Sequence, residues 1–316
     1  MWVFLAFISA LCLGGYDISK KTALRDHRVV DVLTMSILIS SLILSLPLLL
    51  SRACPQMMIG THFYVPCMDL HVHGLIFIKS CIVLSSWIFA YISLKHLPLS
   101  VVSPMQATRP MWTLIGALLI FGERLNAWQW IGIVLALGSI FVFSFRKSTP
   151  PSLQEGNRDK LYYVSLALAI LIGSCAGLYD KYLMRQYDHN AVQVYYTFYQ
   201  ALMMLVVWVV DRFAIGLKNK GKNVSTASNK SLLFTPYSLL PIILISVFLV
   251  ISDNVYMLAL RDPDSLIAVV STIRRGGAVI GFAYGLLFLH EPEPKKKIAC
   301  MVGIMAGLIC LALGSV

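Results

Sequence analysis

The chain has 316 residues, of which 58% are hydrophobic and only 13% are charged. A soluble domain usually contains about 25% charged residues, and a soluble fold of this length could not bury so much apolar surface. The formal net charge of +11 does not indicate nucleic-acid binding, because most lysines and arginines stand in short segments between apolar stretches, where membrane proteins concentrate them. The composition therefore excludes a soluble globular protein and indicates one embedded in a bilayer.

Ten apolar stretches, each long enough for a transmembrane helix of roughly 20 residues, follow one another along the chain. They cover residues 2–24, 29–50, 72–95, 99–121, 127–145, 161–185, 191–214, 237–260, 264–289 and 296–315. The first stretch lacks the basic start and the cleavage site of a signal peptide, so we expect it to remain as a helix. The pattern predicts an all-α integral membrane fold with ten transmembrane helices.

The second half of the chain repeats the first. Five pairs of identical residues are separated by the same 165 positions: Pro98/Pro263, Ser100/Ser265, Arg109/Arg274, Gly116/Gly281 and Tyr91/Tyr256. A Tyr-Asp pair also stands near the start of each half, as Tyr16-Asp17 and as Tyr179-Asp180.

Each half contains five of the ten predicted helices. Because five is an odd number, the second half must insert upside down relative to the first, which is the inverted-repeat plan of many secondary transporters. We therefore expect one five-helix repeat over residues 1–148, a linker over residues 149–160 with Pro150-Pro151, and a second repeat over residues 161–316.

The basic residues indicate an orientation. Numbered in order, the odd loops carry seventeen lysines and arginines and the even loops carry five. The positive-inside rule then makes the odd loops cytoplasmic and places both termini outside a cell membrane. Cys54 and Cys67 share one of the outer loops, where a disulfide can persist. Either a disulfide between them or two reduced cysteines is compatible with the sequence.

The fourth predicted helix ends in a motif that recurs in part in the ninth, the corresponding helix of the second half. It contains Arg109-Pro110, Gly116 and Phe121-Gly122-Glu123, and a glycine-rich fifth helix follows in each half. With the two five-helix halves, this pattern resembles the EamA domain of the drug/metabolite transporter superfamily, over nearly the whole chain.

The resemblance implies alternating access around a central cavity, without a cofactor. Relatives in the superfamily include exporters of amino acids and drugs, plastid phosphate translocators and nucleotide-sugar transporters. Some relatives have both termini in the cytoplasm, whereas the charge distribution of this chain favours termini outside.

Arg109 and Arg274 each lie about ten residues into a predicted helix, which places them roughly 15 Å deep, near the midplane of the bilayer. Arg275 and Lys79 are further cations at membrane depth, whereas Asp253 is the one clear acid there. The arginines either pair with acids such as Asp253 or leave an excess of positive charge that an anionic substrate neutralises. We favour the anion, because a guanidinium group suits carboxylate or phosphate. The Arg274-Arg275 pair is also loosely similar to the Lys-Arg pair of the plastid phosphate translocators.

Polar and aromatic residues near these cations complete the predicted substrate site. Tyr91 and Tyr256 are related by the repeat and supply an apolar wall with one hydroxyl group each. Gln106 and Trp112 lie one turn on either side of Arg109 and are expected on its face. Asp253-Asn254 precedes Tyr256 by one turn and is expected to hold a substrate hydroxyl or amine. The sites predicted for substrate binding are thus Lys79, Tyr91, Gln106, Arg109, Trp112, Asp253, Asn254, Tyr256, Arg274 and Arg275.

Tyr16, Asp17, Tyr179 and Asp180 have two interpretations. Asp17 stands beside Lys20 and Lys21, and Asp180 beside Lys181, so local ion pairs at helix ends are the simpler interpretation. A role in gating is the alternative.

Two further motifs are expected to be structural. Glu123 and Glu291 close the fourth and ninth helices and are expected to cap or pair in loops. The run Cys67-x-Asp69-x-His71-x-His73 is not expected to bind a metal, because a spacing of two suits a strand rather than a helix face.

The predicted function is secondary transport of a small polar organic anion, for example a phosphorylated metabolite, by alternating access. The alternative within transport is an exporter of amino acids, amines or drugs whose arginines are paired internally. A membrane enzyme acting on lipid-linked substrates is a remote alternative, since it would need a nucleophile–base pair or a metal motif, and a receptor would move no substrate. The expected partners are a small-molecule substrate and the bilayer, with no nucleic acid, for a monomer or a homodimer.

Overall fold

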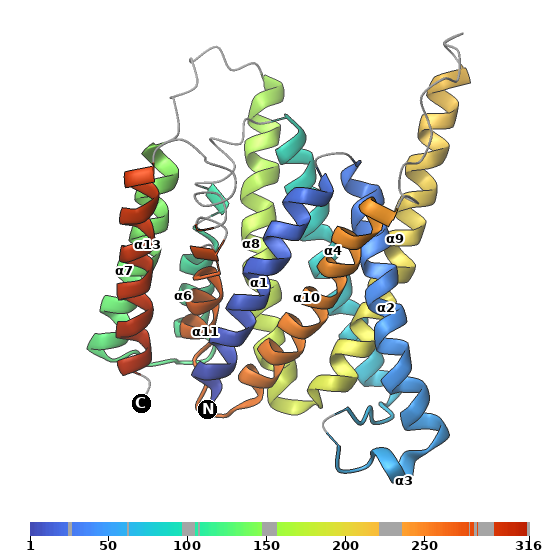
Figure 1. Ribbon diagram of the computed structural model, residues 1–316, viewed down its shortest axis with the longest axis horizontal. Coiled ribbons are helices and arrows are strands. Elements are labelled where there is room, and N and C mark those ends of the chain that lie inside the picture. Colours follow the sequence, from blue (N-terminus) through green and yellow to red (C-terminus); the bar gives the residue numbers. More distant parts are fainter. Residues whose placement is uncertain are drawn as a thin grey trace.

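The computed structural model describes residues 1–24, 27–61, 63–96, 105–106, 108–146, 157–220, 236–277, 279–280, 283 and 294–314. All regular structure within these ranges is helical, and each of the ten predicted stretches contains described helical residues (Figure 1). The helices are α1 Trp2–Leu24, α2 Val29–Ala53, α3 Pro55–Met58, α4 Leu70–His96, α6 Arg109–Ile120, α7 Ala127–Arg146, α8 Asn157–Gln186, α9 His189–Lys220, α10 Pro236–Arg261, α11 Ile267–Arg275 and α13 Pro294–Leu313.

Six of these helices are long and apolar enough to cross a membrane. They contain the spans Trp2–Lys20, Val29–Ala53, Leu70–Ala90, Leu161–Gln186, His189–Phe213 and Leu239–Arg261. Large apolar side chains such as Leu42, Leu119 and Leu202 are exposed on the outer faces of helices, at 72%, 80% and 62%. Such exposure suits lipid rather than water, so the chain is a multi-pass membrane protein.

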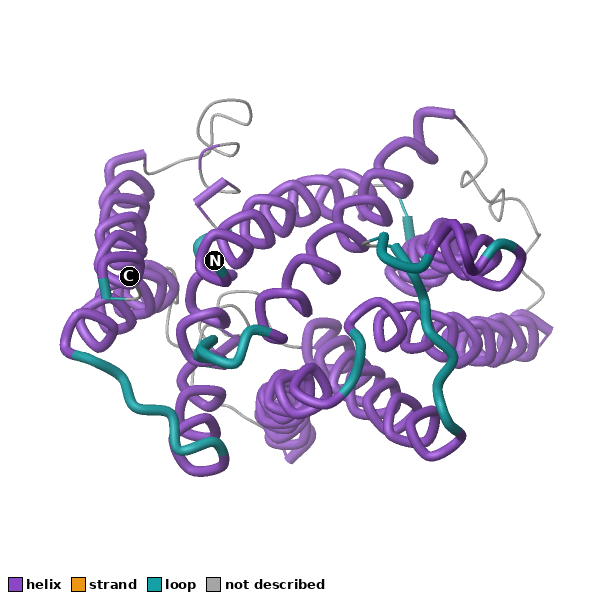
Figure 2. The backbone as a smooth tube through the Cα atoms, turned by 90° about the horizontal axis from the view of Figure 1, so that it is seen from below, coloured by secondary structure: helices purple, strands orange, loops and turns teal. Residues whose placement is uncertain are grey.

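Apart from the short α3, each helix of the first half packs against a helix of the second half, and the pairing is reciprocal. Helix α1 packs along α10 and α4 along α8, while α2 packs against α9, α6 against α11 and α7 along α13. Figure 2 shows the helices side by side around a central region, with the carboxyl-terminal helix at one edge. The interior between the two halves is therefore formed by both of them.

The two termini lie at one end of the helices, together with α3 from the segment between α2 and α4 (Figure 1). The carboxyl ends of α7 and α9 lie at the opposite end. Successive connections between helices therefore lie at alternate ends. The basic odd loops of the sequence fall at one end, and the even loops, which carry fewer basic residues, fall at the other.

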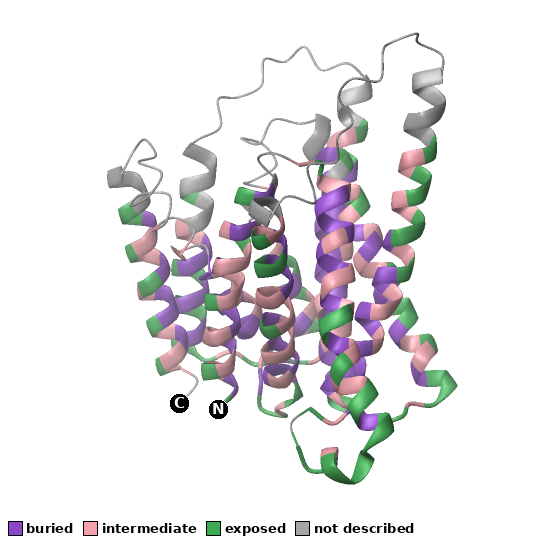
Figure 3. Cartoon of the chain, turned by 45° about the vertical axis from the view of Figure 1, so that its right-hand side comes forward, coloured by how far each residue is buried: buried purple, intermediate pink, exposed green. Residues whose placement is uncertain are grey.

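Helices α7 and α13 approach each other to backbone distance. A Cβ atom on Gly307 would lie 2.6 Å from the backbone nitrogen of Ala136, and one on Gly132 would lie 2.7 Å from the carbonyl oxygen of Gly307. Gly132 and Gly307 are therefore needed for this packing. Figure 3 shows buried and exposed residues alternating around the helices, as expected for helices with one face inward and one face outward.

Candidate functional site

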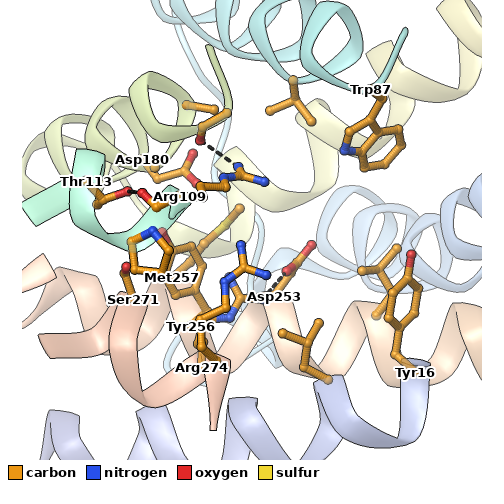
Figure 4. Close-up of a pocket in the computed structure, with 18 of the residues that line it drawn as sticks. Tyr16, Trp87, Arg109, Thr113, Asp180, Asp253, Tyr256, Met257, Ser271 and Arg274 are labelled. Atoms are coloured by element: carbon orange, nitrogen blue, oxygen red, sulfur yellow. Dashed lines mark hydrogen bonds and ion pairs between the residues drawn. The ribbon is translucent and has the colours of Figure 1, made fainter. Parts of the chain in front are cut away.

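A cavity of about 350 Å³ lies between the two halves, with walls from α1, α4, α6, α8, α9, α10 and α11 (Figure 4). Nine of the residues that line it were expected from the sequence to bind substrate or to act in gating: Tyr16, Asp17, Lys79, Arg109, Asp180, Asp253, Tyr256, Arg274 and Arg275. The two repeat-related arginines, predicted near the midplane, thus face one shared space.

Arg109 is the first residue of α6 and is held by main-chain contacts rather than by a carboxylate. Its Nη2 atom donates to the carbonyl oxygen of Gly173 at 2.6 Å, and its own carbonyl accepts from the hydroxyl of Ser174 at 3.1 Å. A Cβ atom on Gly173 would lie 2.6 Å from Cζ of Arg109. Glycine at this position therefore allows the guanidinium group to lie against α8.

Arg274 has a charged partner. Its Nη2 atom lies 2.9 Å from Oδ1 of Asp253 on α10 and 3.3 Å from the hydroxyl of Ser252. Its Cζ atom lies 4.0 Å from the centroid of the Tyr256 ring, a distance at which the ring face attracts a cation. The charge of Arg274 is therefore already balanced by the protein.

Lys79 and Asp180 form a second ion pair, deep between α4 and α8. Lys79 is 1% exposed, and its Nζ atom lies 2.9 Å from Oδ1 of Asp180 and 4.2 Å from the centroid of the Tyr196 ring. The expected local pair of Asp180 with Lys181 is wrong, because the two side chains leave α8 in different directions. Lys181 is buried and donates to the carbonyl and the hydroxyl of Ser265 instead.

The cavity contains more cations than anions. Five cationic side chains line it, Lys20, Lys79, Arg109, Arg274 and Arg275, against the three carboxylates of Asp17, Asp180 and Asp253. Within the described ranges, two of the cations form ion pairs with these carboxylates, and neither Arg109 nor Arg275 forms one with any residue. The arrangement can therefore accept negative charge from a bound molecule.

Two residues predicted on the face of Arg109 do not line the cavity. Trp112 is 46% exposed on the outer side of α6, and Gln106 also lies outside the lining. Thr113 lines the cavity in their place, and its hydroxyl donates to the carbonyl of Arg109 at 3.3 Å. Residues three apart on a helix differ by about 60° in direction and residues four apart by about 40°, and here the closer position faces inward.

Asn254, Tyr179 and Tyr91 do not contribute to the described lining. Asn254 donates to the side-chain oxygens of Asn190 at 3.1 Å and Gln193 at 2.8 Å, behind the cavity wall. The Tyr179 hydroxyl donates to the carbonyl of Leu75 at 3.2 Å, so this residue joins α8 to α4. The side chain of Tyr91 lies outside the described residues.

The remaining motifs have structural places. Glu123 accepts from the backbone N–H groups of Ile267 at 2.7 Å and Ala268 at 3.3 Å, and so caps the start of α11. This confirms the expected capping, whereas Glu291 lies outside the described residues.

Cys54 and Cys67 form no disulfide, and the run from Cys67 to His73 forms no metal cluster. Cys54 and Cys67 are free, exposed thiols, so of the two alternatives the structure has the unbonded one. No group of three or more potential metal ligands occurs in the part of the chain that the structure describes.

Sequence reasoning missed several residues of the lining: Lys20, Trp87, Thr113, Gly173, Gly177 and Ser271. Two signals were available. Thr113 follows Arg109 by four residues, and Gly173 and Gly177 form a small-residue stripe on α8 at the same spacing. Such a stripe lets another group approach the helix backbone closely.

The comparisons with known proteins agree with this architecture. The model of the EamA-like transporter family matches residues 1–145. Among the curated proteins, no match is found. Twenty-six chains of solved structures match. One of them, a crystal structure of a protein, has a TM-score of 0.71 and 10% sequence identity, and the match covers 99% of this chain and 98% of that chain. At that identity the likeness shows the fold alone.

The family match and the apolar helices together confirm the resemblance that the sequence indicated. The chain is a membrane protein with several apolar helices, and the match of its residues 1–145 to the model of the EamA-like transporter family indicates a membrane transporter.

Proposed function

We propose that the protein is a secondary transporter that carries a small polar organic anion through the central cavity. The observation that supports this most strongly is the surplus of cationic side chains, and above all Arg109, which lines the cavity but makes no ion pair among the described residues. Leaving such a charge buried without a counter-charge costs several kcal/mol. A bound anion would remove that cost.

The site chemistry favours a carboxylate or a phosphate as the anionic group. Lys20, Arg109 and Arg275 are the three cations of the lining for which the described residues supply no carboxylate at ion-pair distance, and two of them are arginines. A planar guanidinium group donates two parallel hydrogen bonds to either anion. The aromatic rings of Tyr196 and Tyr256 would contact the apolar part of the cargo. A phosphorylated metabolite is one example of this class.

Transport would proceed by alternating access of two inverted five-helix repeats, residues 1–148 and 161–316, joined by residues 149–160. The reciprocal pairing of helices across the two halves supports this arrangement, because a two-fold relation between repeats produces such an exchange. Rocking of one half against the other would expose the cavity to each side in turn. We assign the protein to the cell membrane, as a monomer or a homodimer that needs no cofactor.

The second candidate function is export of amino acids, amines or drugs. The ion pair between Arg274 and Asp253 favours this alternative, because it is the internal pairing that a neutral or cationic cargo requires. Arg109 distinguishes the two functions. An exporter of amines would gain nothing from an uncompensated guanidinium group in its cavity.

A thermal-shift screen of the purified protein against anionic and cationic metabolites tests the proposal. We expect organic anions to raise the unfolding temperature of the wild type, and to lose this effect in Arg109→Ala. Arg274→Ala should lose part of the effect. Stabilisation by amines alone, unchanged in both variants, would contradict the proposal and favour the exporter.

A further inference from the structure

A second, larger hollow of about 610 Å³ lies away from the central cavity, and we call it the lateral groove. Its walls come from α2, α9, α10 and the segment between α2 and α4. The lining is almost entirely apolar: Ile43, Leu44, Leu46, Pro47, Leu50, Met58, Phe63, Val65, Val194, Val250, Ile251 and Val255, with Asn190, Gln193 and Asn254 as its polar part. It shares no lining residue with the central cavity.

The lateral groove is continuous with the lipid-facing surface. Leu46 is 62% exposed and Ile251 is 43% exposed, and both belong to spans that are long and apolar enough to cross a membrane. Protein interiors do not leave apolar space of this size unfilled, because the lining would lose its packing contacts. Water does not fill such a space either, since an apolar lining offers it too few hydrogen bonds. The acyl chains of the bilayer are therefore the molecules that can fill the groove.

The amide side chains in the groove are occupied with one another rather than offered to a polar cargo. Asn254 donates to Asn190 and Gln193, and Gln193 donates to the carbonyl of Val250 at 2.7 Å. Asn190 donates to the carbonyl of Tyr64 at 3.3 Å. This network satisfies these amide donors within the protein.

A cation stands at the membrane boundary beside the groove. Arg52 is exposed on the last turn of α2, and its guanidinium group donates to the carbonyl of Val65, a groove residue, at 3.3 Å and to the hydroxyl of Tyr195 at 2.7 Å. Among the described residues it has no carboxylate partner. Its charge is therefore complementary to a phosphate group at the level of the lipid headgroups.

We propose that the lateral groove binds one glycerophospholipid, with an acyl chain along α2 and α10 and its phosphate group at Arg52. Lipid tails gain no hydrophobic energy by moving from bilayer to protein, so packing in the groove and the contact of Arg52 with phosphate hold the lipid. This binding does not depend on the proposed transport function. A lipid held in this way would have a fixed position, whereas the other lipids that contact the outer surface would exchange freely.

Photocrosslinking in nanodiscs tests the proposal, with phosphatidylcholine that carries a diazirine on one acyl chain. Peptide mapping should show adducts concentrated in residues 43–50 and 250–255, at least about threefold above those on α13, whose outer face is also exposed. Equal labelling of all lipid-facing helices would mean surface lipids only and would overturn the proposal.

Three matched pairs of variants assign the acyl chain and the headgroup. Leu46→Trp fills the groove and should remove most of the adducts, whereas Leu42→Trp, one turn earlier and 72% exposed outside the groove, should not. Ile251→Trp repeats the test from α10, with Ile243→Trp as its control, in case one variant folds poorly. Arg52→Gln should weaken labelling by the phosphatidylcholine probe but not by a diacylglycerol probe, and Arg124→Gln, another exposed arginine, should change neither. Unchanged labelling in both Leu46→Trp and Ile251→Trp would reject the groove as the site.

Discussion

Arg109 and Arg274 are related by the 165-residue offset between the two halves of the sequence, but their guanidinium groups have different neighbours. Arg274 pairs with Asp253 at 2.9 Å and lies over the ring of Tyr256. Among the described residues, the guanidinium group of Arg109 donates to the carbonyl of Gly173 at 2.6 Å and has no carboxylate partner. The two arginines that this offset relates thus have different partners. Arg274 is neutralised within the protein, and under the proposed function the uncompensated charge of Arg109 is available for a ligand.

Of the changes that test this comparison, removal of the uncompensated Arg109 should have the largest effect on anion affinity. Arg109→Gln is expected to weaken binding of an organic anion about thirtyfold, or about 2 kcal/mol, because a charge-assisted hydrogen bond is lost. Isothermal titration of the purified variant measures the change. Arg28→Gln is the control, because Arg28 pairs with Asp211 far from the cavity. A loss of less than twofold would mean that Arg109 only supports the structure.

The contact of Arg109 with α8 can be disturbed without a change of charge. Gly173→Ala places a Cβ atom 2.6 Å from Cζ of Arg109, so the guanidinium group must move, and we expect about tenfold weaker anion binding. Gly177→Ala is the matched control, one turn along the same helix, since its Cβ atom would meet nothing nearer than the Tyr256 hydroxyl at 3.9 Å. Equal binding by both variants would show that the position of Arg109 is not critical.

Breaking the ion pair between Asp253 and Arg274 should have the opposite effect and strengthen anion binding. Asp253→Asn removes the negative charge that competes for Arg274, so anion binding should tighten about threefold. The Asp253→Asn/Arg274→Gln double variant should bind better than Arg274→Gln alone, which leaves Asp253 uncompensated. Competition binding with one anion across the four proteins gives the coupling. Weaker binding in Asp253→Asn would indicate that Asp253 itself contacts the ligand.

The smallest effect is expected outside the membrane spans, at the cap of α11. Burial raises the pKa of Glu123 above its ordinary value of 4.5, although hydrogen bonds from Ile267 and Ala268 oppose the shift. Between pH 4.5 and the raised pKa the unfolded chain loses this proton first, so Glu123 makes the fold less stable as pH rises. The unfolding temperature of the wild type minus that of Glu123→Gln should therefore fall by about 2 °C over this window. A difference that grows with pH would contradict the shift.

The sequence predicted the elements well and the contacts between them less well. Hydrophobic stretches of fixed length mark membrane helices directly, and the repeat alone identified Arg109 and Arg274 as partners in one site. The ion pair of Lys79 with Asp180 was missed, because it joins helices a hundred residues apart and a lysine adjacent in sequence offered a simpler partner. Trp112 was placed on the wrong face because spacing along one helix does not show which side its neighbours cover. The lateral groove was not predicted, since it needs three helices and a loop in their final positions.

Flux through the reconstituted protein tests the central claim most directly, because it measures both the cargo and the role of Arg109. Proteoliposomes loaded with an organic anion that stabilises the protein should show saturable uptake of the same labelled anion. Uptake should be lost in Arg109→Gln and kept in Arg28→Gln. Saturable flux of amines but not of anions, or anion flux that is unchanged in Arg109→Gln, would contradict the account.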